Sequence, residues 1–247
     1  MPLDKPYFRI TRPFTSATDG RSSKYMISTQ YANDRFVSIK AFHLLLSDLI
    51  KLFDYVEPSR QNTQTYSHRI YELILRAATE FESNCRAILS ANDYPEDRYL
   101  NIKDFFKINK ASKLNEYKVI FNAWSPTPLV LTPFSEWNTS EYKSLSWYQN
   151  YNSIKHNRSA NFHNANLENL MNSISAVFII LYSQFEVLTF DPYQIVKQYS
   201  IDDNDHYIST RSSLFRIKPP RWQDNESYEF DWSSLSLDSN SINKYPF

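Results

Sequence analysis

The stretch LENLMNSISAVFIILYSQF, residues 167–185, decides the fold of this chain. Most of its positions are apolar, and four of them repeat at the spacing of one helical face: Leu170, Ile174, Val177 and Leu181. Its longest apolar run, AVFIILY, is much shorter than the about 20 residues that span a bilayer. The stretch therefore predicts a long core helix in a protein without membrane association.

Two further helices are predicted upstream. In IKAFHLLLSDLIKLFDYV, residues 39–56, apolar residues recur at helical spacing after a capping residue at Asn33 or Asp34. The pattern in SHRIYELILRAATEFESNCRAIL, residues 67–89, is clearer, and its apolar face consists of Ile70, Leu73, Ile74, Ala77, Phe81, Cys85 and Ile88. A shorter helix is predicted after Asn101.

A small β excursion interrupts the helices. The runs KVIF, residues 118–121, and LVL, residues 129–131, have β-forming composition and are separated by SPTP. Prolines on both sides of the second run favour a small hairpin over the centre of a sheet.

The two ends of the chain lack helical periodicity. Residues 1–32 read as an irregular or edge-strand arm. Beyond residue 190 the composition becomes polar, and HYISTRSSLFRIKPPRW predicts one or two strands that pair with the arm, followed by a tail, DWSSLSLDSNSINKYPF. We therefore expect a mainly α fold with three regions: an arm at 1–32, a helical domain at 33–190, and an extension with a tail at 191–247.

Composition excludes several classes of chemistry. Glycine occurs once, at Gly20, whereas phosphate-binding loops, dinucleotide fingerprints and nucleophile elbows all need glycines. The one cysteine, Cys85, lies on an apolar helix face, so we expect neither a disulfide nor a cysteine-rich zinc site. The net charge is +0, so any nucleic acid would bind to a local patch. The amino terminus has no apolar signal core, which indicates a cytoplasmic protein.

A polar stretch, YNSIKHNRSANFH at residues 151–163, precedes the core helix. We predict one continuous helix from Tyr148 to Phe185. At about 100° per residue, four side chains of the stretch then lie within about 60° of one another: Asn152, His156, Ser159 and His163. This polar stripe continues the apolar stripe of the core helix.

The polar stripe has two interpretations. In the first, its members are buried polar groups that the loops at the end of the bundle satisfy. In the second, Lys155, His156 and Arg158 surround the free N–H groups of a helix start and form a local anion site. A histidine there could move protons, and Arg158 could hold a phosphate. No histidine pair has the spacing of a metal site, so we expect no bound metal.

These residues resemble the HEPN superfamily of small α-helical proteins. The similarity rests on the string WYQNYNSIKHNR followed by FHNANL, and on the earlier segments NIKDFFKINKASKLNEYKV and PFSEW, and it covers about residues 34–184. It implies a helical bundle that acts as a metal-independent endoribonuclease without a cofactor. In that family an arginine, a polar residue and a histidine after four to six residues form the motif, and two copies build one cleft. Members often serve toxin–antitoxin or antiviral defence systems.

The family motif can be aligned in two ways. In the first, Arg158, Ser159 and His163 form the motif. In the second, Asn152 and His156 match, and Tyr151 occupies the place of the arginine, for which Arg158 or Lys155 would substitute. The resemblance thus implies Arg158, His163 and His156 as catalytic residues. Asn152, Lys155 and Ser159 would bind substrate.

The implied partners are RNA, a second copy of the chain, and an antitoxin or another protein of a defence system. The alternative is a module that binds RNA or a protein without cleaving it. Tyr151 at the motif position, the neutral charge and the many aromatic residues favour that alternative.

Overall fold

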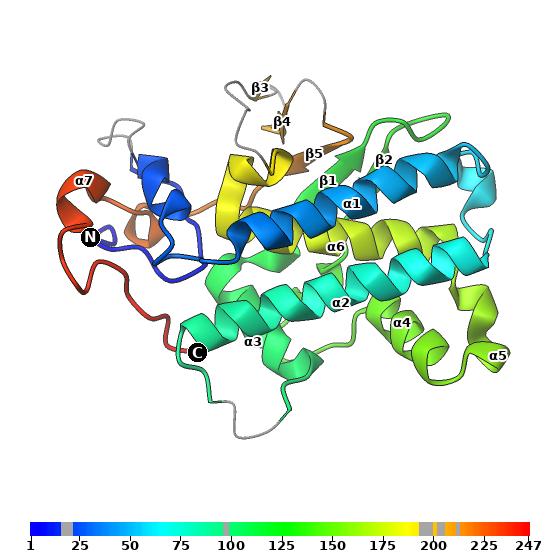
Figure 1. Cartoon of the computed structure of the whole chain (residues 1–247), viewed down its shortest axis with the longest axis horizontal. Helices are drawn as coiled ribbons and strands as arrows, with labels where there is room; N and C mark the ends of the chain where they lie inside the picture. Colours follow the sequence, from blue (N-terminus) through cyan, green and yellow to red (C-terminus); the bar gives the residue numbers. More distant parts are fainter. Residues whose placement is uncertain (16–21, 96–98, 193–199, 202–205, 211–212) are drawn as a thin grey trace.

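A computed structural model of the chain describes residues 1–15, 22–95, 99–192, 200–201, 206–210 and 213–247. These residues form a mainly α-helical protein with a small β-sheet on one side, as predicted (Figure 1). The helical bundle is built from α1 (Arg35–Phe53), α2 (His68–Ala91), α3 (Ile102–Ser112), α4 (Ser146–His156) and α6 (Leu167–Phe185).

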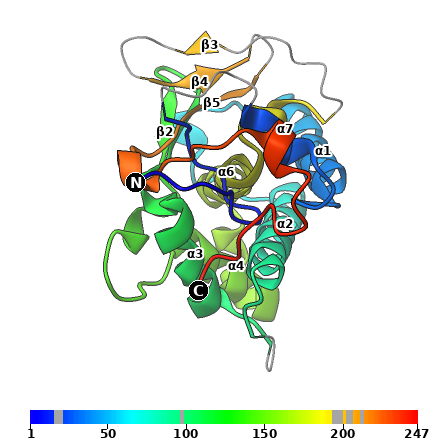
Figure 2. The ribbon, with the colours of Figure 1, turned by 90° about the vertical axis from the view of Figure 1, so that its left-hand side faces the viewer.

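Helix α6 forms the centre of the molecule. Figure 2 shows it between the other helices and the sheet. Every one of its residues except Glu168 and Asn172 is buried, as expected for a helix that is apolar on all sides. Each fully buried Leu, Ile or Phe contributes roughly 1.5–3 kcal/mol. Residues 167–190 are long and apolar enough to cross a membrane, but 78% of their most apolar window is buried inside the protein, as in a central core helix.

The first three helices begin where the sequence predicted them. Asp34 precedes α1, the Ser67 hydroxyl accepts a hydrogen bond from the Ile70 N–H at the start of α2, and Asn101 forms a capping box with Asp104 in α3. The predicted apolar face of α2 is fully buried. These helices depend on local signals, so their positions were predictable.

The single helix predicted from Tyr148 to Phe185 is wrong. The chain forms α4, then α5 (Arg158–Asn161), a 3₁₀ turn η5 (Phe162–Asn164), and α6. Asn157 breaks the helix with extended backbone angles, φ −144° and ψ 77°, and its side chain accepts a hydrogen bond from the Ala160 N–H. Asn166 caps α6 in the same way by accepting from the Asn169 N–H. Asparagine side chains thus compete successfully with the helical backbone pattern.

The sheet is antiparallel and has the strand order β2-β1-β5-β4-β3 in the described residues. The strands are β1 (Lys118–Phe121), β2 (Leu129–Leu131), β3 (Ser200–Ile201), β4 (Ile208–Ser209) and β5 (Phe215–Lys218). The predicted hairpin β1–β2 is present, but β1 also pairs with β5 and lies inside the sheet. The Phe215 ring packs on Phe121 and on Phe178 of α6, so the sheet covers one side of the core helix.

Both ends of the chain pack on this core, and two predictions for them need correction. Strand β5 pairs with β1, and β4 pairs with β5, rather than with the amino-terminal arm. The arm instead pairs with Tyr228 and Asn243. Residues 231–247 are no free tail, because Trp232 is buried in the short helix α7 (Trp232–Leu235), and Tyr245 and Phe247 pack against the core. The apolar core contains residues from all three predicted regions of the chain. The boundaries between these regions stay a prediction.

A buried polar network ties the arm to the bundle. The Arg9 guanidinium is 5% exposed; it pairs with Asp34 and donates to the Gln184 side-chain oxygen over 2.9 Å. The Gln184 amide donates in turn to Asn84 of α2 over 3.0 Å. Burial lowers the pKa of Arg9 to about 10, so the guanidinium remains charged at neutral pH.

Candidate functional site

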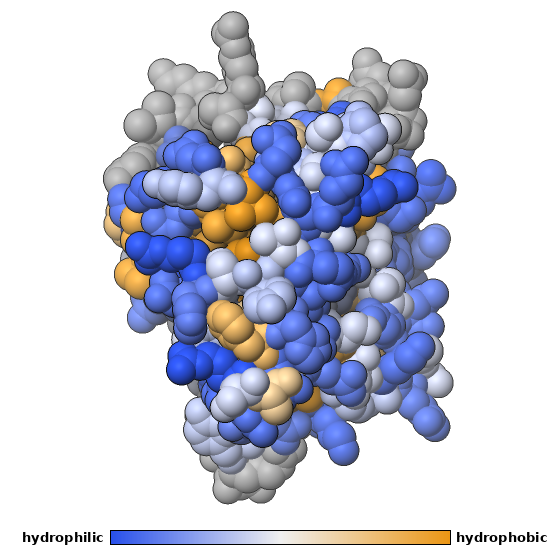
Figure 3. All heavy atoms as spheres, turned by 90° about the vertical axis from the view of Figure 1, so that its right-hand side faces the viewer, coloured by the Kyte–Doolittle hydropathy of each residue, from blue (hydrophilic) through white to orange (hydrophobic). Residues whose placement is uncertain are grey.

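The predicted site residues lie on the connection between α4 and α6. We call residues 155–164 the basic turn. Figure 3 views the molecule from the end where α5 lies in Figure 1, and this end is mainly hydrophilic with small apolar patches. Lys155, His156, Arg158, Ser159 and His163 are exposed.

Helix α4 leads into the basic turn. Its Trp147, Tyr148, Tyr151 and Ile154 are buried at helical spacing, which leaves Asn152 half-buried and Lys155 and His156 exposed. Lys155 and His156 lie in the last turn, where the negative end of the helix dipole favours cations. The prediction that these two residues surround the positively charged start of a helix is therefore wrong. The charge of Lys155 complements a helix end, and an anion would be attracted by the side chains alone.

Phe162 anchors the turn to α2. Its ring lies 4.7 Å from the His68 ring and 5.5 Å from the Tyr66 ring, measured between centroids. The Arg158 guanidinium lies over the Tyr71 ring at 5.5 Å, a cation–π contact. Because Phe162 immediately precedes His163, this aromatic contact positions the segment that carries both Arg158 and His163.

The structure separates the two motif alignments. Asn152 and His156 belong to α4, whereas Arg158, Ser159 and His163 follow the break at Asn157. The common stripe expected from a continuous helix is therefore not formed. Within the described residues, none of these five side chains forms a hydrogen bond, and both histidines are exposed. The interpretation of the histidines as buried, satisfied core groups is wrong.

Tyr151 lies on the opposite face of α4 from the solvent. It is 3% exposed, and its hydroxyl accepts a hydrogen bond from the Lys155 ammonium over 3.0 Å. Burial raises the pKa of Tyr151, although Lys155 acts against this, and the same hydrogen bond raises the pKa of Lys155. Tyr151 is thus neutral and Lys155 charged at neutral pH. Next to them, the Tyr148 hydroxyl donates to Glu82 over 2.8 Å.

A polar cavity of about 430 Å³ adjoins the basic turn. We call it the amide cavity, because six carboxamide side chains line it: Gln64, Asn150, Asn164, Asn166, Asn169 and Asn172. Glu136 and Glu168 also line it. Sequence reasoning did not identify this cavity. The available signal was the density of asparagines between Asn150 and Asn172. It was missed because all of these asparagines had been assigned to the predicted continuous helix.

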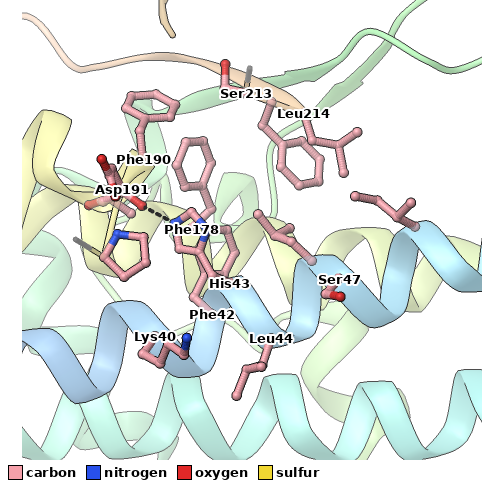
Figure 4. A pocket seen from close by; sticks show the side chains of 15 residues that line it. Lys40, Phe42, His43, Leu44, Ser47, Phe178, Phe190, Asp191, Ser213 and Leu214 are labelled. Carbon is pink, nitrogen blue, oxygen red and sulfur yellow. Dashed lines mark hydrogen bonds between the residues drawn. The ribbon is translucent and has the colours of Figure 1, made fainter. Parts of the chain in front are cut away.

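A second cavity, of about 560 Å³, lies between α1, the 3₁₀ segment η6 (Glu186–Phe190) and β5 (Figure 4). It is mainly apolar, with Phe42, Phe178 and Phe190 in its wall. His43 also lines it, with its Nε2 atom 3.0 Å from the carbonyl oxygen of Thr189. This contact fixes the orientation of the His43 ring in the cavity wall.

The described residues contain no group of three or more His, Cys, Asp and Glu side chains that could hold a metal ion. Comparison with protein-family models, curated proteins and solved structures gave no match. The case for a function therefore depends on the geometry of the basic turn and the amide cavity.

Proposed function

We propose that this chain is a HEPN-like, metal-independent endoribonuclease of a toxin or antiviral defence system. The observation that supports it is the exposure of Arg158 and His163 on one short segment, anchored to α2 by Phe162. Neither side chain is engaged in a hydrogen bond to a described residue, so both are available to a ligand. Lys155 adds a positive charge beside them, and His156 adds a second imidazole.

The proposed reaction is an attack of an RNA 2′-oxygen on the adjacent phosphorus. The new P–O2′ bond forms while the P–O5′ bond breaks, which leaves a 2′,3′-cyclic phosphate and a free 5′-hydroxyl. His163 assists the proton transfer, with His156 as the second imidazole, because one proton leaves O2′ and one is taken up by O5′. Arg158 binds the non-bridging oxygens and stabilises their growing charge.

Asn152, Lys155 and Ser159 would position the substrate. Lys155 is charged and lies next to the turn, so it suits a neighbouring phosphate. Two copies of the chain would bring two such turns together, which supplies a second Arg158 and a second His163 to one cleft. We propose a homodimer for this reason. An antitoxin or defence partner would bind the same exposed face and control access to it.

Two substitutions test the assignment. His163→Ala and Arg158→Ala should each reduce RNA cleavage by at least about 100-fold, the usual range for removing a general acid–base group. Both side chains are exposed, so the free energy of unfolding should change by less than about 0.5 kcal/mol. Arg69→Ala, which removes another exposed arginine, is the control and should cleave normally. Folded variants with full cleavage would reject the assignment.

The second candidate is a module that binds RNA or protein without cleaving it. It is favoured by Tyr151, which is buried and bound to Lys155 where the second alignment needs an arginine. Purified protein that binds RNA or one partner protein, yet leaves all RNA intact with and without metal ions, would establish this candidate in place of the first.

A further inference from the structure

The amide cavity lies where several segments of the chain meet. Asn150 comes from α4, Asn164 from η5, and Asn169 and Asn172 from α6. The loop after β2 and the 3₁₀ segment η4 (Ser135–Trp137) complete the wall, with Glu136 from η4. Its volume of about 430 Å³ is within the range of about 300–1,000 Å³ that is typical of small-molecule sites.

Hydrogen bonds hold the amides of this cavity in fixed orientations. The Asn150 amide donates to the Asn169 side-chain oxygen over 3.1 Å, and the Asn166 amide donates to Gln64 over 3.1 Å. Gln64 then donates to Glu168 over 2.9 Å. Gln64, Asn166 and Asn169 each use the side-chain oxygen and one amide hydrogen in such bonds. Each carboxamide has two donor hydrogens and two lone pairs on its oxygen, so one donor and one acceptor position of each remain for a ligand. A preorganised set of donors and acceptors suits a flat, polar molecule.

The charge of the cavity restricts the ligand further. Glu136 and Glu168 line it, and among the described residues no lysine or arginine does. Burial acts to raise the pKa of Glu136, but hydrogen bonds from Ser146 and Ser135 hold it below its usual range. The carboxylate is therefore ionised at neutral pH. Such a cavity repels phosphates and carboxylates and accepts a neutral group with N–H donors.

The basic turn, which adjoins the amide cavity, has the opposite preference and favours anionic groups. Asn164 of the cavity follows His163 of the basic turn in the chain, and its amide donates to the Ser153 hydroxyl of α4 over 3.3 Å. A ligand that reaches both places would carry a neutral, donor-bearing group joined to a nearby anionic group. A nucleotide has this composition, since its base is neutral and its phosphate is anionic.

We propose that the amide cavity binds an RNA base that carries an exocyclic amino group, while the adjacent phosphate lies on the basic turn. Carboxylates accept hydrogen bonds from the amino groups of adenine, cytosine and guanine, and amides complement the rest of the base edge. Uracil has carbonyl oxygens where the other bases carry an amino group, and these oxygens would face two carboxylates. This inference rests on the proposed function and assigns its substrate class.

Binding of 2′-O-methyl oligonucleotides, which lack the attacking hydroxyl, tests the inference separately from cleavage. The wild-type protein should bind oligo(A) and oligo(C) about 10-fold more tightly than oligo(U), as expected for one discriminating base contact. Glu136→Gln and Glu168→Gln should reduce this preference, because each replaces an acceptor oxygen with a donor amide. Glu141→Gln, an exposed carboxylate outside the cavity, should retain it.

The outcomes separate the two proposals. Equal binding of all oligonucleotides, or a preference that survives both substitutions, would overturn the base pocket and leave the ribonuclease proposal intact. If no oligonucleotide binds, the proposed function fails and the inference fails with it. Should Glu136→Gln not fold, because Glu136 accepts from the Ser146 N–H at the start of α4, the exposed Glu168 decides alone.

A free nucleoside is another source of the same base. Adenosine titrated alone should bind far more weakly than oligo(A), because it has no phosphate for Arg158. Tighter binding of the nucleoside than of the strand would overturn the assignment to RNA.

Discussion

Asn157 determines how the candidate site is built. With its backbone extended, α4 ends at His156 and a new turn begins at Arg158. The two motif alignments thereby fall on two separate elements. Tyr151 is buried among core residues, whereas Arg158 is exposed. At the scale of single residues, the exposed pair Arg158 and His163 is therefore the better candidate for phosphate chemistry.

We expect the ionisation of Glu186 to make the stability of the fold depend on pH. It is half-buried at the carboxyl end of α6, with a positive φ of 46°, and its carboxylate forms no hydrogen bond to a described residue. Burial raises its pKa from 4.5 to about 7. Between these values the folded chain holds a proton that the unfolded chain has released, so stability is greatest below pH 4.5 for this group and falls as pH rises through 7.

The substitution Glu186→Gln should remove this loss. We expect the variant to exceed the wild type in free energy of unfolding by on the order of 2 kcal/mol at about pH 8, and by much less at about pH 5. Urea unfolding at the two pH values measures the difference. Glu229→Gln, at an exposed carboxylate, is the control. A Glu186→Gln gain of equal size at both pH values would contradict the assigned titration.

At the scale of elements, we expect the packing of Phe162 on α2 to affect the rate of RNA cleavage. Phe162→Ala should reduce RNA cleavage at least about 10-fold. Without the anchor, Arg158 and His163 would be misplaced, and a displacement of about 1 Å is enough to lower a reaction rate by this factor or more. Since the side chain is only partly buried, the loss of stability should be about 1–2 kcal/mol and the protein should remain folded. Thermal unfolding and cleavage assays on the same sample measure both effects.

Phe247→Ala provides the matched control, because Phe247 is also a partly buried aromatic residue and lies at the end of the molecule opposite α5. It should retain cleavage. Activity of Phe162→Ala equal to the wild type would show that the anchor does not position Arg158 and His163.

The elements also show which features of the fold were predictable. Helices α1, α2 and α3 carry caps and apolar faces within their own sequences, and they begin where these signals indicated. The break at Asn157 was missed, because an asparagine can cap a helix or continue one and only the surroundings decide. The pairing of β1 with β5 joins residues about a hundred positions apart, which no local pattern encodes.

The candidate site was predictable only in part. Periodicity alone placed Asn152, His156, Ser159 and His163 on one stripe, and that placement depended on an unbroken helix. The chemical types of Arg158 and His163 could be read from the sequence, but their exposure could not. The amide cavity needs residues from Gln64 to Asn172, so it exists only in the folded chain.

At the scale of the whole molecule, the two ends of the chain depend on each other. The N–H of Leu3 donates to Ser227, and the Tyr228 hydroxyl donates to the carbonyl oxygen of Ile10 over 2.8 Å. Figure 1 shows both termini at the end of the molecule opposite α5. A chain that ends at residue 230 should lose the packing of Trp232 and Tyr245 and unfold at a temperature lower by several degrees.

RNA cleavage by the truncated chain serves as the control for this experiment. Because the basic turn lies at the far end, the shortened protein should cleave RNA normally below its unfolding temperature. An unchanged unfolding temperature would show that the last residues contribute little to the fold.

The most direct test of the central claim is an analysis of RNA ends after incubation with the purified full-length chain in excess chelator. The account predicts cleavage that continues without metal ions, fragments with 2′,3′-cyclic phosphate and 5′-hydroxyl ends, and no cleavage at a site with a 2′-deoxy sugar. Intact RNA, cleavage that the chelator abolishes, or fragments with 5′-phosphate ends would contradict it.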